Sequence, residues 1–144
     1  MFNCIVVGTD GSDTADRAVT QAAELAEAGG ASLHLVSAYE PAAVHVGGGA
    51  AVRERGDFAL GPDYKVDAVL SRAAGRLRGK GVELELHSPK GDPADAILEV
   101  AQREDADLIV VGSKGMRGAK RLLGSVPNKV SHHATCDVLI VRTD

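Results

Sequence analysis

The chain of 144 residues is poor in aromatic side chains, with no tryptophan, two phenylalanines and two tyrosines. Its core must therefore be built from valine, isoleucine, leucine and alanine. No aromatic residues alternate with basic ones to form a stacking surface for nucleic acid. The net charge of −4 also has the wrong sign for binding a large polyanion such as a nucleic acid. We therefore expect no nucleic-acid partner.

Long apolar runs are also missing. None approaches the roughly 20 residues of a membrane span, and the first residues lack the basic segment and apolar stretch of a signal peptide. We expect a cytoplasmic protein with no membrane partner. Because the cytosol is reducing, Cys4 and Cys136 are expected to be free and to pack as small apolar side chains.

The five histidines show no metal-ligand spacing. His132 and His133 are adjacent and point to different sides of a helix, near the negative end of its dipole. His34 and His87 lie in strand-like runs, and His45 lies in an expected loop. The sequence predicts no metal site.

Short apolar runs alternate with segments of helical periodicity along the chain. The expected strands are residues 4–7, 32–38, 82–86, 108–111 and 138–141. The expected helices include residues 15–26, 66–77, 93–101 and 124–134. This alternation predicts an α/β fold of three layers with an open parallel five-stranded sheet, in a single domain over residues 1–144. Residues 82–86 alternate with period two, which is typical of a sheet edge.

The pattern fails over residues 41–62, where three consecutive glycines precede a charged run. We interpret this segment as a mobile surface insertion. Elsewhere, helix boundaries are clearly marked. Ser12 or Asp13 can cap the first helix, and Asp92 can cap the third with Pro93 in its first turn.

The most informative segment follows the apolar run 108–111. Gly112 and Gly115 are separated by two residues, and eight further residues separate Gly115 from Gly124-Ser125, which stands at the start of a helical pattern. Glycine lets the backbone pass close to a ligand. Free backbone N–H groups, a hydroxyl and a helix N-terminus near one another can hold phosphate. Ser125 as a plain helix cap is the simpler alternative.

The distribution of charge supports an anionic ligand. Residues 108–136 contain no acid in an otherwise acidic chain, and they contain five cations, Lys114, Arg117, Lys120, Arg121 and Lys129. A solvated basic helix face is the alternative interpretation. Together with the glycines, however, the local positive charge favours a small polyanion such as a nucleotide.

These residues resemble the universal stress protein family over essentially the whole chain. The resemblance is carried by the opening Ile5 to Ser12, by Gly91-Asp92-Pro93 and by the run from Val110 to Val141. Within that run, Gly112-x2-Gly115 and Gly124-Ser125 look like the glycine signature of the family's ATP-binding branch. The resemblance implies a Rossmann-like sheet of order 3-2-1-4-5, similar to the adenine nucleotide alpha hydrolase-like fold, and a homodimer. It also implies ATP at the switch point of the sheet, outside the carboxyl ends of the strands.

Carried over position by position, the resemblance implies a set of nucleotide contacts. The backbone of Ala38 would meet the adenine. The ribose region would be contacted by Gly8, Thr9 and Asp10. The ribose and phosphate side would be lined by Val111, Gly112, Ser113, Gly115 and Arg117. The phosphates would be covered by Gly124, Ser125 and Val126.

One departure from the family bears on the ligand. The second and third glycines are usually separated by nine residues, and here the gap is the eight residues from Met116 to Leu123. The shorter loop affects the triphosphate end more than adenosine recognition, so cyclic AMP is the alternative ligand.

The sequence favours a binding protein over an enzyme. The GxxxxGK[ST] phosphate loop is absent, and no acid lies in the phosphate segment to hold a metal. Asp10 could bind Mg²⁺ only through a bound nucleotide, which leaves a slow ATPase or an adenylyl-transfer enzyme as the rival class. We expect a nucleotide-binding regulatory protein of the stress response, with a dimeric interaction module that has lost its ligand as a further alternative. The apolar strand Val138–Val141 would form the dimer edge.

Overall fold

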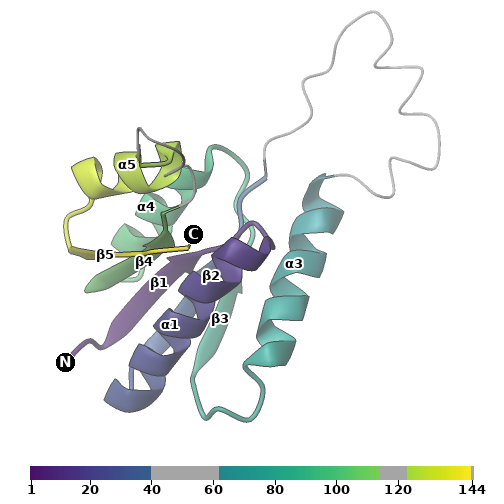
Figure 1. Ribbon diagram of the computed structural model, residues 1–144, viewed down its shortest axis with the longest axis vertical. Coiled ribbons are helices and arrows are strands. Elements are labelled where there is room, and N and C mark those ends of the chain that lie inside the picture. Colours follow the sequence, from purple (N-terminus) through teal and green to yellow (C-terminus); the bar gives the residue numbers. More distant parts are fainter. Residues whose placement is uncertain (40–61, 114–122, 144) are drawn as a thin grey trace, which may run out of the picture.

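The computed structural model describes residues 1–39, 62–113 and 123–143, and its strands form one parallel sheet (Figure 1). The order of the five strands is β3-β2-β1-β4-β5. This order confirms the arrangement that the family resemblance implied, and it puts the switch point between β1 and β4. The strands are β1 (Cys4–Gly8), β2 (Ser32–Val36), β3 (Leu84–His87), β4 (Leu108–Gly112) and β5 (Asp137–Val141).

Helices cover both faces of the sheet. They are α1 (Asp13–Gly29), α3 (Pro62–Arg76), α4 (Pro93–Arg103) and α5 (Ser125–His133). On one face, α1 and α3 pack Ala22 and Leu70 into a core with Val7. On the other face, α4 and α5 pack Ile97 and Val130 against the opposite side of the central strands. The two cores account for the three layers (Figure 1).

Burial explains the difference between central and edge strands. β1 is buried along its middle three residues and β4 along its first four, because both faces of these strands are covered. In β3 the two consecutive residues Glu85 and Leu86 are both exposed, so neither face of this strand is fully covered, as expected at an edge. The regular part of β3 begins at Leu84 rather than at Val82. Pairing nevertheless extends further back, because the backbone N–H of Leu33 donates to the carbonyl of Glu83 at 2.8 Å.

Two of the helices begin at the predicted caps. The Ser12 hydroxyl accepts from the N–H of Ala15 at 3.1 Å at the start of α1. The Asp92 carboxylate accepts from the N–H of Asp95 at 3.1 Å at the start of α4, where Pro93 lies in the first turn. These caps fix the direction in which both helices leave the carboxyl ends of the strands.

Other expectations concern the rest of the chain. Cys4 and Cys136 are free, as predicted, and burial raises the pKa of both thiols. They are half-buried rather than fully enclosed. In the described ranges, no helix combines the length and apolar character needed to cross a bilayer. The expected insertion at 41–62 lies outside the described residues except at its last position.

Candidate functional site

A pocket of about 430 Å³ opens at the carboxyl ends of β1, β2 and β4. Its volume lies within the roughly 300–1,000 Å³ of small-molecule sites. Ligands of open α/β sheets bind at this position, where the chain turns to opposite sides of the sheet. The described residues that line the pocket are Gly8, Thr9, Asp10, Thr14, Ala15, Val36, Ala38, Pro93, Ile97, Val111, Gly112, Gly124, Ser125, Val126, Pro127 and Thr143.

Most of the site residues named from the sequence line this pocket together. They are Gly8, Thr9, Asp10, Ala38, Val111, Gly112, Gly124, Ser125 and Val126. Ser113 is buried and does not appear in the pocket lining. Gly115 and Arg117 lie outside the described residues.

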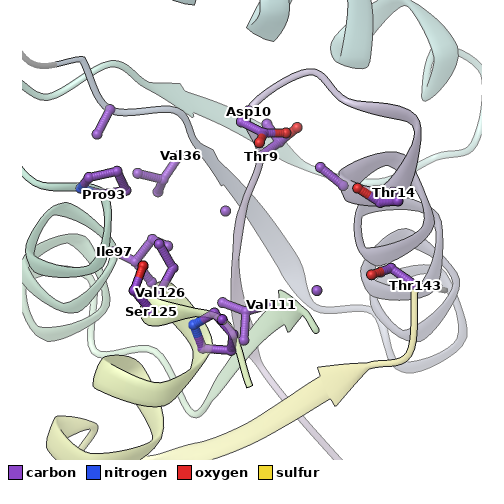
Figure 2. A pocket seen from close by; sticks show the side chains of 16 residues that line it. Thr9, Asp10, Thr14, Val36, Pro93, Ile97, Val111, Ser125, Val126 and Thr143 are labelled. Carbon is purple, nitrogen blue, oxygen red and sulfur yellow. The ribbon is translucent and has the colours of Figure 1, made fainter. Parts of the chain in front are cut away.

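One side of the pocket is apolar. Figure 2 shows Val36, Pro93 and Ile97 on that side, facing Thr14 and Thr143 across the pocket. Gly8 is needed for close approach here, since a Cβ at Gly8 would lie 2.5 Å from Cδ1 of Ile97. Such a surface can cover a flat apolar ring while offering few polar groups.

The turn after β1 presents a carboxylate at the rim. Asp10 accepts from both the backbone N–H of Ser12 at 2.9 Å and its hydroxyl at 2.6 Å. The Thr9 hydroxyl accepts from the N–H of Gly11 at 3.1 Å, and Gly11 has φ +82°. These bonds hold a tight turn, so Asp10 is also a turn former. Its side chain is fixed beside the pocket and can accept hydrogen bonds from hydroxyl groups.

The N-terminus of α5 lies at the opposite end of the lining. Gly124 is its N-cap, and no side chain makes a capping hydrogen bond. Ser125 is therefore the first helical residue, and the simpler interpretation of Ser125 as the cap is wrong. The N–H groups of Ser125 and Val126 have no intrahelical acceptor, because the first turn of any helix lacks one. Such an end attracts anions.

Ser113 supports the wall from behind. Its N–H donates to the Val141 carbonyl at 2.9 Å, and its hydroxyl accepts from the N–H of Thr143 at 3.1 Å. Ser113 and Thr143 are both buried. These bonds tie the end of β4 to the last residue of β5 and to Thr143 beyond it, and they hold Thr143 in the pocket wall.

Lys129 joins the two helices that flank the pocket. Its ammonium lies 2.8 Å from Asp95 and 3.3 Å from Asp92. The hydrogen bond to Asp95, followed by that to Asp92, raises the pKa of Lys129. The Asp95 backbone N–H is the main cause that lowers the pKa of Asp92, and Lys129 adds to it. The interpretation of Lys129 as a purely solvated side chain is therefore incomplete. The other four cations of that segment lie outside the described residues.

Sequence reasoning missed several lining residues. They are Thr14, Ala15, Val36, Pro93, Ile97, Pro127 and Thr143. Most of these residues lie in the first turns of α1, α4 and α5, which begin beside the strand ends. They could be predicted by expecting the first turns of the neighbouring helices, as well as the strand ends, to line a pocket at the switch point. Thr143 follows the end of β5, and no local signal in the sequence marks it.

The arrangement offers recognition groups. Asp10 is the sole carboxylate among the described lining residues. The lining combines an apolar side, a carboxylate that accepts from hydroxyls and the uncapped end of a helix. A base-like ring, a sugar and an anion would match these three parts in turn.

The fold and the site define an α/β protein with a ligand-sized pocket at its switch point. The universal stress protein family model matches residues 1–142, and the chain belongs to this family. It is 42% identical over 150 residues to the universal stress protein Rv1636 of Mycobacterium tuberculosis, covering 99% of this chain and 97% of that protein. It is 36% identical over 156 residues to the universal stress protein YxiE of Bacillus subtilis, covering 99% of this chain and all of that protein.

Two similar solved structures contain adenine nucleotides. A universal stress protein in complex with cAMP is 36% identical, with a TM-score of 0.76, and the match covers 99% of this chain and 98% of that one. The universal stress protein of Archaeoglobus fulgidus in complex with dAMP is 27% identical, with a TM-score of 0.70, covering 96% and 97% of the two chains.

Proposed function

We propose that this chain is a regulatory protein of the stress response that binds an adenine nucleotide in the switch-point pocket. The observation that carries this proposal is that the uncapped N-terminus of α5 lines a pocket that also has an apolar side. The apolar side would cover adenine, Asp10 would accept from ribose hydroxyls, and Ser125 and Val126 would donate to phosphate. The solved relatives with cAMP and dAMP support the same ligand class.

ATP is the candidate that the glycine signature favours, and cyclic AMP is the second. Three observations favour cyclic AMP. The glycine loop is one residue shorter than the family spacing, and the relative in complex with cAMP is 36% identical. In addition, the first N–H groups of α5 lie in the described part of the lining and suit a single phosphate.

The ligand is identified by releasing it from gently purified protein and by titration. Mass spectrometry of the released material and calorimetry with ATP, cyclic AMP and adenosine distinguish the candidates. We expect adenosine to bind more weakly than at least one of the two nucleotides, because it lacks the phosphate. Equal affinity for adenosine and both nucleotides would remove the phosphate role of α5, and no binding at all would overturn the proposal.

The same proposal makes the protein a binder rather than an enzyme. Asp10 is the carboxylate through which a nucleotide-bound Mg²⁺ could be held, and it already accepts two hydrogen bonds within its own turn. We expect at most slow hydrolysis of ATP when Mg²⁺ is supplied. Steady turnover that disappears in Asp10→Asn would instead favour the ATPase alternative.

We also propose a homodimer through β5, acting in the cytoplasm. β5 is the edge strand beside β4, and Val138 to Val141 are half-buried apolar residues. A two-fold mate would cover this edge. Ile140→Lys should give monomer or aggregate by light scattering, with circular dichroism to check folding. A folded variant that remains fully dimeric would exclude this edge.

A further inference from the structure

Two histidines that are 53 positions apart in the sequence meet at the β3 edge of the sheet. In the parallel pairing of β2 with β3, His34 lies opposite Glu85, and Val36 lies opposite His87. Side chains alternate between the faces of a sheet. His34, Glu85 and His87 therefore share one face, and the sequence showed no such grouping because its members come from two strands.

The three side chains lie close together, and the two imidazoles share a hydrogen bond that a bound metal ion would replace. Nδ1 of His34 lies 2.9 Å from Nε2 of His87 and 3.7 Å from a carboxylate oxygen of Glu85. One ligand atom from each residue falls within 4.8 Å of the others. Tetrahedral zinc with bonds of about 2.0–2.1 Å needs its ligand atoms ~3.3 Å apart. Movements of a few tenths of an ångström for the histidine pair would reach that spacing.

Burial leaves one side of the cluster open. His34 is 3% exposed, His87 is half-buried and Glu85 is exposed. The two rings lie close together, with centroids 5.1 Å apart and an angle of 25° between their planes. A metal ion held here would be bound by the two imidazole nitrogens on its buried side and would be open to water on the side of Glu85.

We propose that His34, Glu85 and His87 bind a divalent metal ion of the zinc class. Nδ1 of His34, Nε2 of His87 and one oxygen of Glu85 are the ligands, and water completes the fourth position. Imidazole suits zinc and its neighbours, and a carboxylate offsets part of the charge. The site is separate from the nucleotide pocket, and its existence does not depend on the proposed function.

Two observations bear on the state of the ligands. Burial, followed by the nearby His34, lowers the pKa of His87, which favours the neutral ring that metals bind. Nδ1 of His87 lies 3.3 Å from the guanidinium of Arg103. When Nε2 binds metal, Nδ1 carries the proton, so Arg103 must turn toward its other partners, Glu99 and Glu104. Arg103 therefore competes with the metal.

The test uses untagged full-length protein, stripped with a chelator and titrated with Zn²⁺ against a chromophoric competitor. We expect one zinc per chain. Loss of an outer partner typically costs 10–100-fold in metal affinity, so loss of a ligand in His87→Gln should cost at least about 100-fold. Glu85→Gln, at an exposed position that tolerates change, should also weaken binding. Arg103→Gln should strengthen zinc binding severalfold. The substitution removes the competing guanidinium, and the new amide oxygen can accept a hydrogen bond from Nδ1–H of His87.

Matched controls are available on the same strand and elsewhere. Glu83→Gln removes a carboxylate two residues from Glu85, and a double change of His132 and His133 to glutamine removes two exposed imidazoles. Both should leave zinc affinity unchanged. X-ray absorption of the bound zinc should show two imidazoles. Wild-type zinc affinity in His87→Gln and Glu85→Gln, zinc lost only with His132 and His133, or no zinc bound by folded wild type would each overturn the proposal.

Discussion

The N-termini of α4 and α5 lie on the same face of the sheet, and both contribute to the pocket. They differ in how their first backbone N–H groups are capped. α4 is capped by its own Asp92, whose charge is also paired with Lys129. α5 begins at Gly124 without a side-chain cap. A helix end that satisfies its own donors is a structural element, whereas an end that leaves them open is available to a ligand. In our proposal, α4 therefore contributes to the apolar wall and α5 contributes the anion contact.

The largest expected effect comes from blocking the open end. Ser125→Asp places a carboxylate where we expect phosphate. Because an acid in the first turn of a helix is favourable, the variant should fold at least as well as wild type. Hydrogen bonds to charged groups contribute roughly 1.5–3 kcal/mol each. Loss of one hydrogen bond to the phosphate should therefore weaken nucleotide binding about 10–100-fold in calorimetry.

The control for Ser125→Asp introduces the same negative charge at a different position of α5. Asn128→Asp adds the same carboxylate one turn later, at an exposed position of α5 outside the pocket lining. It should weaken nucleotide binding much less than Ser125→Asp does, because its carboxylate does not occupy the position that we expect for the phosphate. Equal losses in Ser125→Asp and Asn128→Asp would mean that net charge, rather than the helix end, governs binding.

A second change tests the apolar wall of α4. Gly8→Ala brings a Cβ within 2.5 Å of Cδ1 of Ile97, so the end of the Ile97 side chain must shift in the pocket wall. Overpacking of this kind costs roughly 1–3 kcal/mol, and we expect lower stability together with weaker binding of adenosine and nucleotides alike. Adding Ile97→Val, which removes Cδ1, should recover part of both losses. A double variant no better than Gly8→Ala would show that Ile97 is not the cause.

Changes at the capped N-terminus of α4 should lower the free energy of unfolding more than they lower nucleotide affinity. Asp92→Ala removes the cap of α4, which typically costs about 0.5–2 kcal/mol, and urea unfolding should show that loss. Asp92→Ser keeps a capping hydroxyl and should retain most of the stability. Nucleotide affinity should change little in either variant. A larger effect on affinity than on stability would contradict the assignment of this end to structure.

The smallest effect is a pH dependence of the same cap. The Asp95 backbone N–H, together with Lys129, lowers the pKa of Asp92 below its ordinary value of 3.8. Its contribution is therefore fully present above pH 3.8 and is lost as the pH falls through the lowered folded-state pKa. The stability difference between wild type and Asp92→Ser should shrink below pH 3.8 in urea titrations. A difference that grows in acid would contradict this sign.

The sequence could predict the fold because each element carries its own signal. Central strands read as continuous apolar runs, Asp92-Pro93 marks a helix start, and alternation in residues 82–86 marks an edge. Strand order was not available from periodicity and came from the family resemblance. The structure confirms that order.

The site was predictable where chemistry follows a strand end and unpredictable where it depends on packing. Gly8 and Gly112 were found because glycines follow buried strands. Ile97 and Thr143 were missed because their place in the wall comes from helix packing and from the hydrogen bonds of Ser113. His34 and His87 were dismissed separately, since only the register of β2 with β3 brings them together.

The most direct test of the two helix ends is a backbone amide NMR titration with adenosine and with cyclic AMP. The shift difference between the two complexes reports the phosphate. We predict that it is largest at the N–H groups of Ser125 and Val126 and small at Ala94 and Asp95 in the first turn of α4. A phosphate-dependent difference centred on Ala94 and Asp95, or absent from α5 although cyclic AMP binds, would contradict the account.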